Sequence, residues 1–317
     1  MRRVLAASTL ACVLLASAGA HAQTAAASIT ILTSAQSGAY HALGVALSQI
    51  YAQASPRMRA TAQVTKAPVE SLNMLQAGRG ELAFAPGDVL SGAWRGDEEA
   101  GFKTPLKNLR GLSATFDNYV HIVARAESGI RTVADLKGKR LSVGTARSAT
   151  ELAAHALVRA AGLTYKDFAK IEYLPFGQSV ELMKDRQIDA MVQSAVVGAV
   201  SIRDLATAVK VVVVAIPLDV VARAGDGYRP GTITANSYPG QATDVPTAAV
   251  PNFLVTQSEV PDEVAYEMTR SLYDHLDKLY AANSAAKTIK RDNALVGMPV
   301  PLHPGAERYY QEVGVIK

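Results

Sequence analysis

Segments with strand character and segments with helix character alternate along most of the chain, and this alternation constrains the fold more than any other feature. Residues 28–32 alternate apolar and polar side chains, residues 34–38 interrupt them with a glycine, and residues 40–54 carry apolar side chains at helical spacing. The same strand–turn–helix unit recurs in two blocks, and such units build sheets that are covered by helices. The sequence therefore predicts an α/β fold with two lobes and a ligand cleft between them.

The two blocks set the expected lobe boundaries. We expect residues 28–122 and 246–317 to form lobe I, and residues 123–245 to form lobe II. Residues 217–246 are rich in Gly, Pro, Tyr and Asp and predict a long ordered connection, while residues 262–280 predict the longest helix. Ligands of open α/β sheets bind beyond the carboxyl ends of the strands, so a site is expected at the turns that lead into helices.

The first 22 residues have the three-part layout of a secretory signal peptide. Arg2 and Arg3 supply positive charge, residues 4–18 are apolar apart from small hydroxyl side chains, and residues 20–22 form an Ala-x-Ala cleavage site. We expect cleavage after Ala22 and delivery of the mature chain to the periplasm. A membrane anchor is the alternative, although the apolar run is shorter than the roughly 20 residues that a membrane span needs.

The composition argues against several classes of protein. The single cysteine, Cys12, falls inside the predicted leader, so the mature chain is expected to have neither disulfides nor thiolate chemistry. Removing the leader lowers the formal net charge from +4 to +2, because residues 1–22 carry two arginines and no acid. No run of five like charges occurs, so neither nucleic acid nor an anionic membrane surface is an expected partner. We expect a monomer.

The sequence motifs of common catalytic and metal sites are missing. No two histidines stand four residues apart, and neither HExxH nor a Cys/His metal spacing occurs. A GxSxG elbow and the glycine loops that bind phosphates or dinucleotides are also missing. Residues 284–287 match the SxxK pattern of penicillin-binding enzymes without a KTG partner, and we interpret this match as chance. We therefore expect no catalytic residue, no metal and no cofactor.

Two turns between a strand and a helix have the composition of anion sites. Residues 34–40 contain a glycine, and residues 144–151 contain Gly144 followed by hydroxyl side chains and an arginine. A glycine lets a ligand approach backbone N–H groups, and a helix N-terminus favours negative charge. Glu151 also suits a capping box with Ser148. Simple N-capping without a ligand is the alternative for either turn, but the occurrence of two such turns favours a shared anion site.

Several segments, spread from residue 29 to residue 316, carry a resemblance to a known family. They are Thr33–Gly44, Asp135–Gly144 with Ser148–Glu151, Gln187–Ala190, Tyr238–Gln241 and the most specific of them, Pro301–Gly314. The sequence resembles the TAXI family of solute receptors, which serve certain tripartite ATP-independent periplasmic (TRAP) transporters. The resemblance implies a type II periplasmic-binding-protein fold whose lobes close on an amino acid, a dicarboxylate or a related small acid. It also implies an integral membrane permease, driven by an ion gradient, as the partner.

The sequence departs from the family pattern at positions near the expected cleft. Pro68 and Ser71 replace a serine and an asparagine, and residues 86–88 read Pro-Gly-Asp where the family has Gln-Ser-Asp. Lys66 and Arg147 replace glycines. We hypothesise that Arg147, with Lys66, pairs with a ligand carboxylate, because the planar guanidinium suits bidentate binding. The alternative is that both side chains turn to solvent at the rim of the cleft.

Twelve residues make up the expected ligand-binding set. Motif position supports Tyr40 and Tyr238, whereas Phe116 is expected to be buried and Trp94 to cover the core of lobe I. The expected ligand is an anionic or zwitterionic small molecule that carries a carboxylate and is passed to a TRAP permease. The full set is Ser34, Ser37, Gly38, Tyr40, Lys66, Ser71, Asp88, Arg147, Ser148, Thr150, Gln193 and Tyr238.

Three other functions fit the same chain. A binding protein of another importer class and a sensor that does not transport would both share this architecture. A periplasmic hydrolase is the third, and it requires a pair of nucleophile and base that the sequence does not display.

Overall fold

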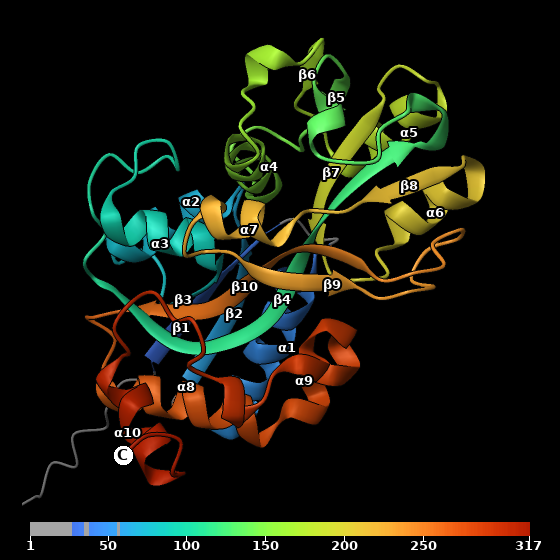
Figure 1. The fold of residues 1–317 in the computed structure, drawn as a ribbon. Helices are drawn as coiled ribbons and strands as arrows, with labels where there is room; N and C mark the ends of the chain where they lie inside the picture. The colour runs from blue at the N-terminus through green and yellow to red at the C-terminus, as the bar shows by residue number, and fades with distance from the viewer. Residues whose placement is uncertain (1–26, 35–37, 56–57) are drawn as a thin grey trace, which may run out of the picture.

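The protein has the predicted two-lobed α/β fold (Figure 1). The computed structural model describes residues 27–34, 38–55 and 58–317. Ten strands in these residues form one continuous sheet that extends through both lobes. The predicted signal peptide over residues 1–22, its cleavage site and Cys12 lie outside the described residues, as does Ser37.

Lobe I begins with three strand–helix units near the N-terminus. Its elements in chain order are β1 (Ala27–Thr33), α1 (Ala39–Ala54), β2 (Met58–Val64), α2 (Pro68–Gln76), β3 (Leu82–Pro86) and α3 (Gly87–Arg95). β1 lies between β2 and β3, and all three strands are parallel. Leu43, Leu47 and Ile50 are buried on one face of α1, as their helical spacing predicts.

Two long antiparallel strands run from one lobe into the other. They are β4 (Leu109–Arg125) and β10 (Val245–Gln257). One half of β10 lies between β3 and β4, whereas the far half of β4 pairs with strands of lobe II, and Figure 1 shows β4 passing unbroken between the lobes. The sequence predicts only residues 119–124 and 247–256 of these strands, because Ser113 and Asp117 interrupt the apolar pattern of β4.

Lobe II holds the remaining strands and four helices. They are β5 (Arg140–Ser142), α4 (Ala149–Ala160), β6 (Lys170–Glu172), α5 (Phe176–Lys184), β7 (Ala190–Ala195), α6 (Val200–Ala208), β8 (Val211–Val214), α7 (Leu218–Ala224) and β9 (Arg229–Ile233). The strand order is β2-β1-β3-β10-β4-β7-β5-β6, with β8 paired to β4 and β9 paired to β10. The connection predicted over residues 217–246 is ordered, but it contains α7 and β9. The buried Val220 and Val221 hold α7 on the core.

The C-terminal region returns to lobe I as three helices and several single turns. The helices are α8 (Asp262–Asp274), α9 (Leu276–Ala282) and α10 (Pro304–Glu312). The prediction of one longest helix over residues 262–280 is wrong, because the backbone leaves helical geometry at His275 (φ −130°, ψ 36°) and α1, with 16 residues, is longer. Short 3₁₀ turns span Ala126–Ser128, Ala134–Leu136, Tyr165–Asp167, Ser284–Thr288 and Arg291–Asn293.

The segment 301–314 packs its tyrosines into lobe I. The rings of Tyr309 and Tyr273 stack with centroids 5.8 Å apart, and the Tyr310 hydroxyl donates to the Leu112 carbonyl at 2.8 Å. Gly305 permits the close approach of α10 to α8, since a Cβ there would lie 2.7 Å from the Tyr266 nitrogen. This segment therefore has a structural task in the core of lobe I.

A half-buried ion cluster gives the segments 135–144 and 187–190 a structural role. The Asp189 carboxylate accepts from the guanidinium of Arg140 at 2.7 Å and from that of Arg125 at 2.9 Å. These charge-assisted bonds hold the pKa of Asp189 well below its usual range. The aspartate of the 187–190 segment and the arginine of the 135–144 segment thus meet at the start of β7, where they stabilise lobe II.

The proposed lobe boundaries fall in and beside the two crossing strands. Val120 and Ile122 of β4 pack in the core of lobe II, and so do Ala248 and Val250 of β10. Leu112 and Leu254, on the other halves of the same strands, pack in lobe I. Within the described ranges, no helix combines the length and apolar character needed to cross a membrane.

Candidate functional site

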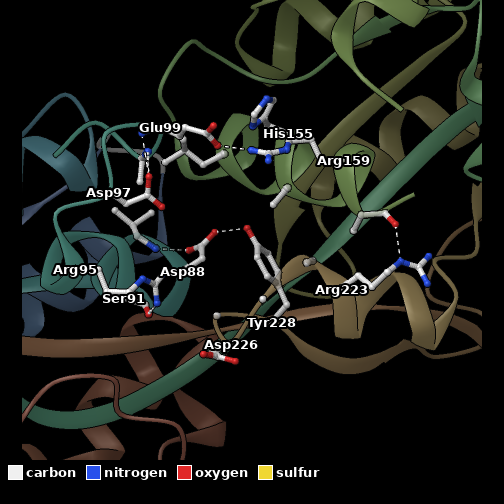
Figure 2. A pocket seen from close by; sticks show the side chains of 18 residues that line it. Asp88, Ser91, Arg95, Asp97, Glu99, His155, Arg159, Arg223, Asp226 and Tyr228 are labelled. Atoms are coloured by element: carbon white, nitrogen blue, oxygen red, sulfur yellow. Dashed lines mark hydrogen bonds and ion pairs between the residues drawn. The ribbon is translucent and has the colours of Figure 1, made fainter. Parts of the chain in front are cut away.

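A cavity of about 580 Å³ lies between the two lobes and takes its walls from both. Lobe I contributes α3 and the loop that follows it, up to Ala100. Lobe II contributes one face of α4, the end of α7 and residues 225–228 (Figure 2). The cavity is large enough for a small metabolite, since ligand pockets are commonly about 300–1,000 Å³.

Asp88 and Tyr228 bridge the lobes at this cavity. The Tyr228 hydroxyl of lobe II donates to Oδ2 of Asp88 at 2.8 Å, while Oδ1 accepts from the Val89 backbone N–H at 2.8 Å. Figure 2 shows the two side chains pointing toward each other. Burial raises the pKa of Asp88 to about 6, an effect that outweighs these hydrogen bonds.

Other contacts bring the same surfaces together. Gly227 lies so close to Asp88 that a Cβ on the glycine would be 2.7 Å from the aspartate Cβ. Arg159 of α4 forms an ion pair with Glu99 of lobe I. Leu152 of α4 packs against an apolar cluster of lobe I. The lobes are therefore in direct contact around the cavity, in a closed arrangement.

The charged side chains on the cavity wall differ in how their charge is compensated. Arg223 pairs with Asp219 at 2.8 Å, outside the cavity lining. Arg95 donates to the Ser91 hydroxyl at 2.6 Å and forms no ion pair within the described ranges. Asp226 has neither a hydrogen bond nor an ion pair with any described side chain. Arg95 and Asp226 are thus charged groups that a ligand can reach.

Asp88 is the one member of the predicted set that lines this cavity in the described structure. Sequence reasoning missed Arg95 and Tyr228. Arg95 lies two turns after Asp88 on the same face of α3, and that spacing was the available signal. Tyr228 lies 140 residues from Asp88, and no local pattern links the two.

The turn before α4 is shaped by packing within lobe II. Gly144 has φ +88°, and a Cβ there would lie 2.9 Å from the Thr150 Cβ, so a glycine is required. Ser148 caps α4 by accepting from the Glu151 N–H at 3.2 Å. The predicted capping box is only half formed, because the Glu151 carboxylate accepts from the N–H of Arg147 and not from that of Ser148.

Arg147 and Thr150 have different environments in that turn. Arg147 is exposed and adopts φ +60°, a left-handed conformation that is uncommon for a residue with a Cβ. It is outside the described lining of the cavity. Thr150 is buried, and its hydroxyl accepts from the Ser194 N–H at 3.2 Å.

The turn between β1 and α1 places its tyrosine in the core. Gly38 is the N-cap residue of α1, and Ser34 is half-buried directly after β1. The Tyr40 hydroxyl donates to the Asn252 side chain, and its ring stacks on Phe84 at 5.2 Å. Tyr40 therefore joins α1 to the crossing strand β10. Phe116 and Trp94 lie in and over the core of lobe I, as predicted.

At the start of α2, the predicted residues divide between exterior and interior. Lys66 is exposed, and its backbone N–H donates to the Glu70 carboxylate at 2.6 Å. Ser71 is buried, with its hydroxyl 2.7 Å from that of Thr65. Ser71 thus fixes the turn between β2 and α2.

Gln193 and Tyr238 are both buried in lobe II. The Gln193 side chain accepts from the Ser201 hydroxyl at 2.8 Å. The Tyr238 oxygen accepts from the Gly198 N–H at 3.0 Å and lies 2.8 Å from Nε2 of His121. Since Nδ1 of His121 faces only carbonyl oxygens, it carries the proton, and Nε2 accepts from Tyr238. Burial lowers the pKa of His121 to about 4, so the ring is neutral at pH 7.

Family and fold comparisons agree with this architecture. The model of the NMT1-like family matches residues 31–314. The periplasmic binding protein BugD is similar with a TM-score of 0.55 at 12% identity, over 90% of this chain and 94% of its own. A TctC solute binding protein from Polaromonas gives 0.52 at 13% identity, over 91% and 98%. A putative L-cystine ABC transporter from Listeria monocytogenes gives 0.50 at 16% identity, over 83% and 98%. These likenesses establish the two-lobed fold of periplasmic binding proteins.

Proposed function

The chain belongs to the NMT1-like family, and from this premise we propose that it is a periplasmic solute-binding receptor. It captures a small carboxylate-bearing metabolite, an amino acid, a dicarboxylate or a keto acid, and releases it chemically unchanged. The observation that carries the proposal is the cavity of about 580 Å³ with one wall on each lobe. Because both lobes contribute contacts, a bound solute favours the closed arrangement over an open one.

Arg95 is our candidate for the group that binds the solute carboxylate. Arg95 lines the cavity, and its guanidinium has a serine hydroxyl as its described side-chain partner. A guanidinium binds a carboxylate through two parallel hydrogen bonds. The other two arginines of the lining already form ion pairs, with Glu99 and Asp219.

A binding assay with matched arginine variants tests the proposal. Thermal-shift screening of amino acids, dicarboxylates and keto acids identifies a solute, and a ligand at a hundredfold excess over its Kd raises stability by about 2.7 kcal/mol. Arg95→Gln should weaken binding by roughly 10- to 100-fold, since a hydrogen bond to a charged group contributes about 1.5–3 kcal/mol. Arg79→Gln, an exposed arginine of lobe I beyond the cavity lining, is the control. Equal affinity in Arg95→Gln would remove Arg95 from the site.

Arg147 and Lys66 are a second candidate pair for the carboxylate, at the rim of the cleft. Both side chains are exposed and outside the described cavity lining, so a role for them requires a movement of their turns. Arg147→Ala in the same titration should cost at least about tenfold in affinity if the guanidinium binds the solute. Wild-type affinity would leave Arg147 as a solvated surface residue.

The partner and the compartment are the finer parts of the proposal. The TAXI resemblance of the sequence supports a TRAP-type permease driven by an ion gradient as the acceptor of the solute. Uptake into vesicles that hold such a permease should require this protein and an ion gradient but no ATP. ATP-dependent uptake would point to an importer of the ABC type. Sequencing the N-terminus of exported protein tests periplasmic delivery and cleavage after Ala22.

A further inference from the structure

The charges on the cavity wall are of both signs, with an excess of acid. Four carboxylates line it, on Asp88, Asp97, Glu99 and Asp226, against three guanidinium groups, which leaves a net charge of minus one when His155 is neutral. A cavity that is specific for a dianion is expected to have the opposite balance. The charge balance of the cavity wall therefore indicates which charges a ligand should carry.

Pairing inside the protein makes the imbalance larger. Arg159 is neutralised by Glu99, and Arg223 by Asp219. Arg95 is then the one cation of the described lining without an ion pair. Three carboxylates have no cationic partner among the described residues: Asp88, Asp226 and Asp97, the last of which accepts from the backbone N–H of residue 99 at 2.9 Å.

Helix α3 presents opposite charges along a single face. Asp88, Ser91 and Arg95 follow at intervals of three and four residues, so they line up on the side that faces the cavity. The Arg95 guanidinium folds back to Ser91, where Nη1 donates to the hydroxyl at 2.6 Å. The rise from residue 88 to residue 91 is about 4.5 Å at 1.5 Å per residue. A molecule of amino-acid size can reach both charges.

We propose that the solute is a zwitterion, a small acid that also carries a protonated nitrogen. Arg95 takes the acid, and Asp88 and Asp226 take the nitrogen. This inference rests on the proposed function and narrows it, because it rejects dicarboxylates and keto acids as preferred ligands.

Asp88 has the capacity for this additional contact. An ionised carboxylate offers about four acceptor sites, and Tyr228 and Val89 occupy two of them. The raised pKa of Asp88 is consistent with a carboxylate that is buried without a cation. A protonated nitrogen beside it would lower that pKa, so binding near pH 6 should release protons.

The test is a solute panel arranged by charge and matched in carbon number. It contains α- and ω-amino acids, dicarboxylates, 2-keto acids and diamines, and the strongest stabiliser of each class goes on to calorimetry with the full chain. We expect the best zwitterion to bind at least tenfold more tightly than the best dianion. At pH 6, calorimetry in buffers of different ionisation enthalpy should show proton release.

Single substitutions test separately the residues that bind the acid group and those that bind the protonated nitrogen. Asp88→Asn and Asp226→Asn should each weaken the zwitterion at least fivefold while leaving dianions unchanged or bound more tightly, whereas Arg95→Gln should weaken both classes. Asp277→Asn, an exposed acid of α9 far from the lining, is the control. A dicarboxylate, keto acid or diamine as the tightest ligand would overturn the inference and leave a solute-binding function intact. Folded protein that no class of solute stabilises would instead contradict the proposed function.

Discussion

Replacing Gly227 by alanine should prevent full closure of the two lobes. A Cβ at this position would lie 2.7 Å from the Cβ and 2.8 Å from the amide nitrogen of Asp88, on the opposite lobe. Carbon atoms in contact are about 3.5–4.0 Å apart, so the lobes must separate locally by roughly 0.8 Å or more. The φ angle of Gly227 lies outside the left-handed region, and alanine is therefore compatible with its own lobe.

That displacement is sufficient to break the bridge between the lobes. The hydrogen bond from Tyr228 to Asp88 is 2.8 Å long. Lengthened by about 0.8 Å, it no longer meets the geometry of a hydrogen bond. Losing a hydrogen bond to a charged group costs about 1.5–3 kcal/mol, so the closed form should become at least tenfold less populated relative to the open one.

Small-angle scattering and hydrogen exchange measure the opening directly. Gly227→Ala should have a larger radius of gyration than the wild type and faster exchange at the start of α3. Its affinity for the solute found by the charge panel should fall about tenfold. Gly177→Ala is the matched control, because a Cβ at Gly177 in lobe II meets nothing within 4 Å. If Gly227→Ala scatters, exchanges and binds as the wild type does, the lobes do not close on this contact and the reasoning is refuted.

Three further predictions concern pH and stability. The pKa of Asp88 is raised to about 6, so the closed form binds this proton more tightly than an exposed carboxyl does. The closed form should therefore become more populated, and the radius of gyration smaller, as the pH falls from 8 to 5. A pH response that persists in Asp88→Asn would contradict this assignment. Asp189→Asn should lower the free energy of unfolding by about 1.5–3 kcal/mol in urea titrations, because two guanidinium groups lose their shared carboxylate while Arg125 keeps its ion pair with Glu127. The exposed Asp185→Asn should cost far less. Tyr238→Phe should cost about 1–3 kcal/mol, since Nε2 of His121 and the N–H of Gly198 lose their partner. Tyr280→Phe is the control, because the Tyr280 hydroxyl makes a single hydrogen bond among the described residues, to the Ile289 carbonyl; an equal loss there would argue against a special role for Tyr238.

The fold was predictable wherever a local pattern determines it. Alternation of strands and helices gave the α/β architecture, and Ile29 and Ile31 of the alternating first strand are fully buried. The first half of β4 was not predictable, because Ser113 and Asp117 interrupt its apolar pattern and suggest a loop. Pairing with β10, which is distant in the sequence, keeps this segment a strand. Likewise, the break at His275 is a change of direction that does not interrupt the apolar periodicity of the segment.

Less of the candidate site than of the fold could be predicted from the sequence. Asp88 was expected in the cleft and lines the cavity. The one local signal for Arg95 is its position two turns after Asp88 on the same face of a helix. Tyr228 becomes relevant only when lobe II places it opposite Asp88. In contrast, the motif position of Tyr40 marks a residue of the core, since its hydroxyl donates a hydrogen bond to Asn252 of the crossing strand β10.

The return of β10 to lobe I has a consequence for the newly made chain. β3 pairs with β10 through Pro86 and Asn252, so all of lobe II is synthesised between the two partners. Until β10 emerges from the ribosome, one edge of β3 lacks its neighbour, and its five residues are entirely apolar. Such an edge invites pairing with other chains. The nascent protein therefore leaves this apolar edge unpaired until synthesis has passed Gln257, the last residue of β10.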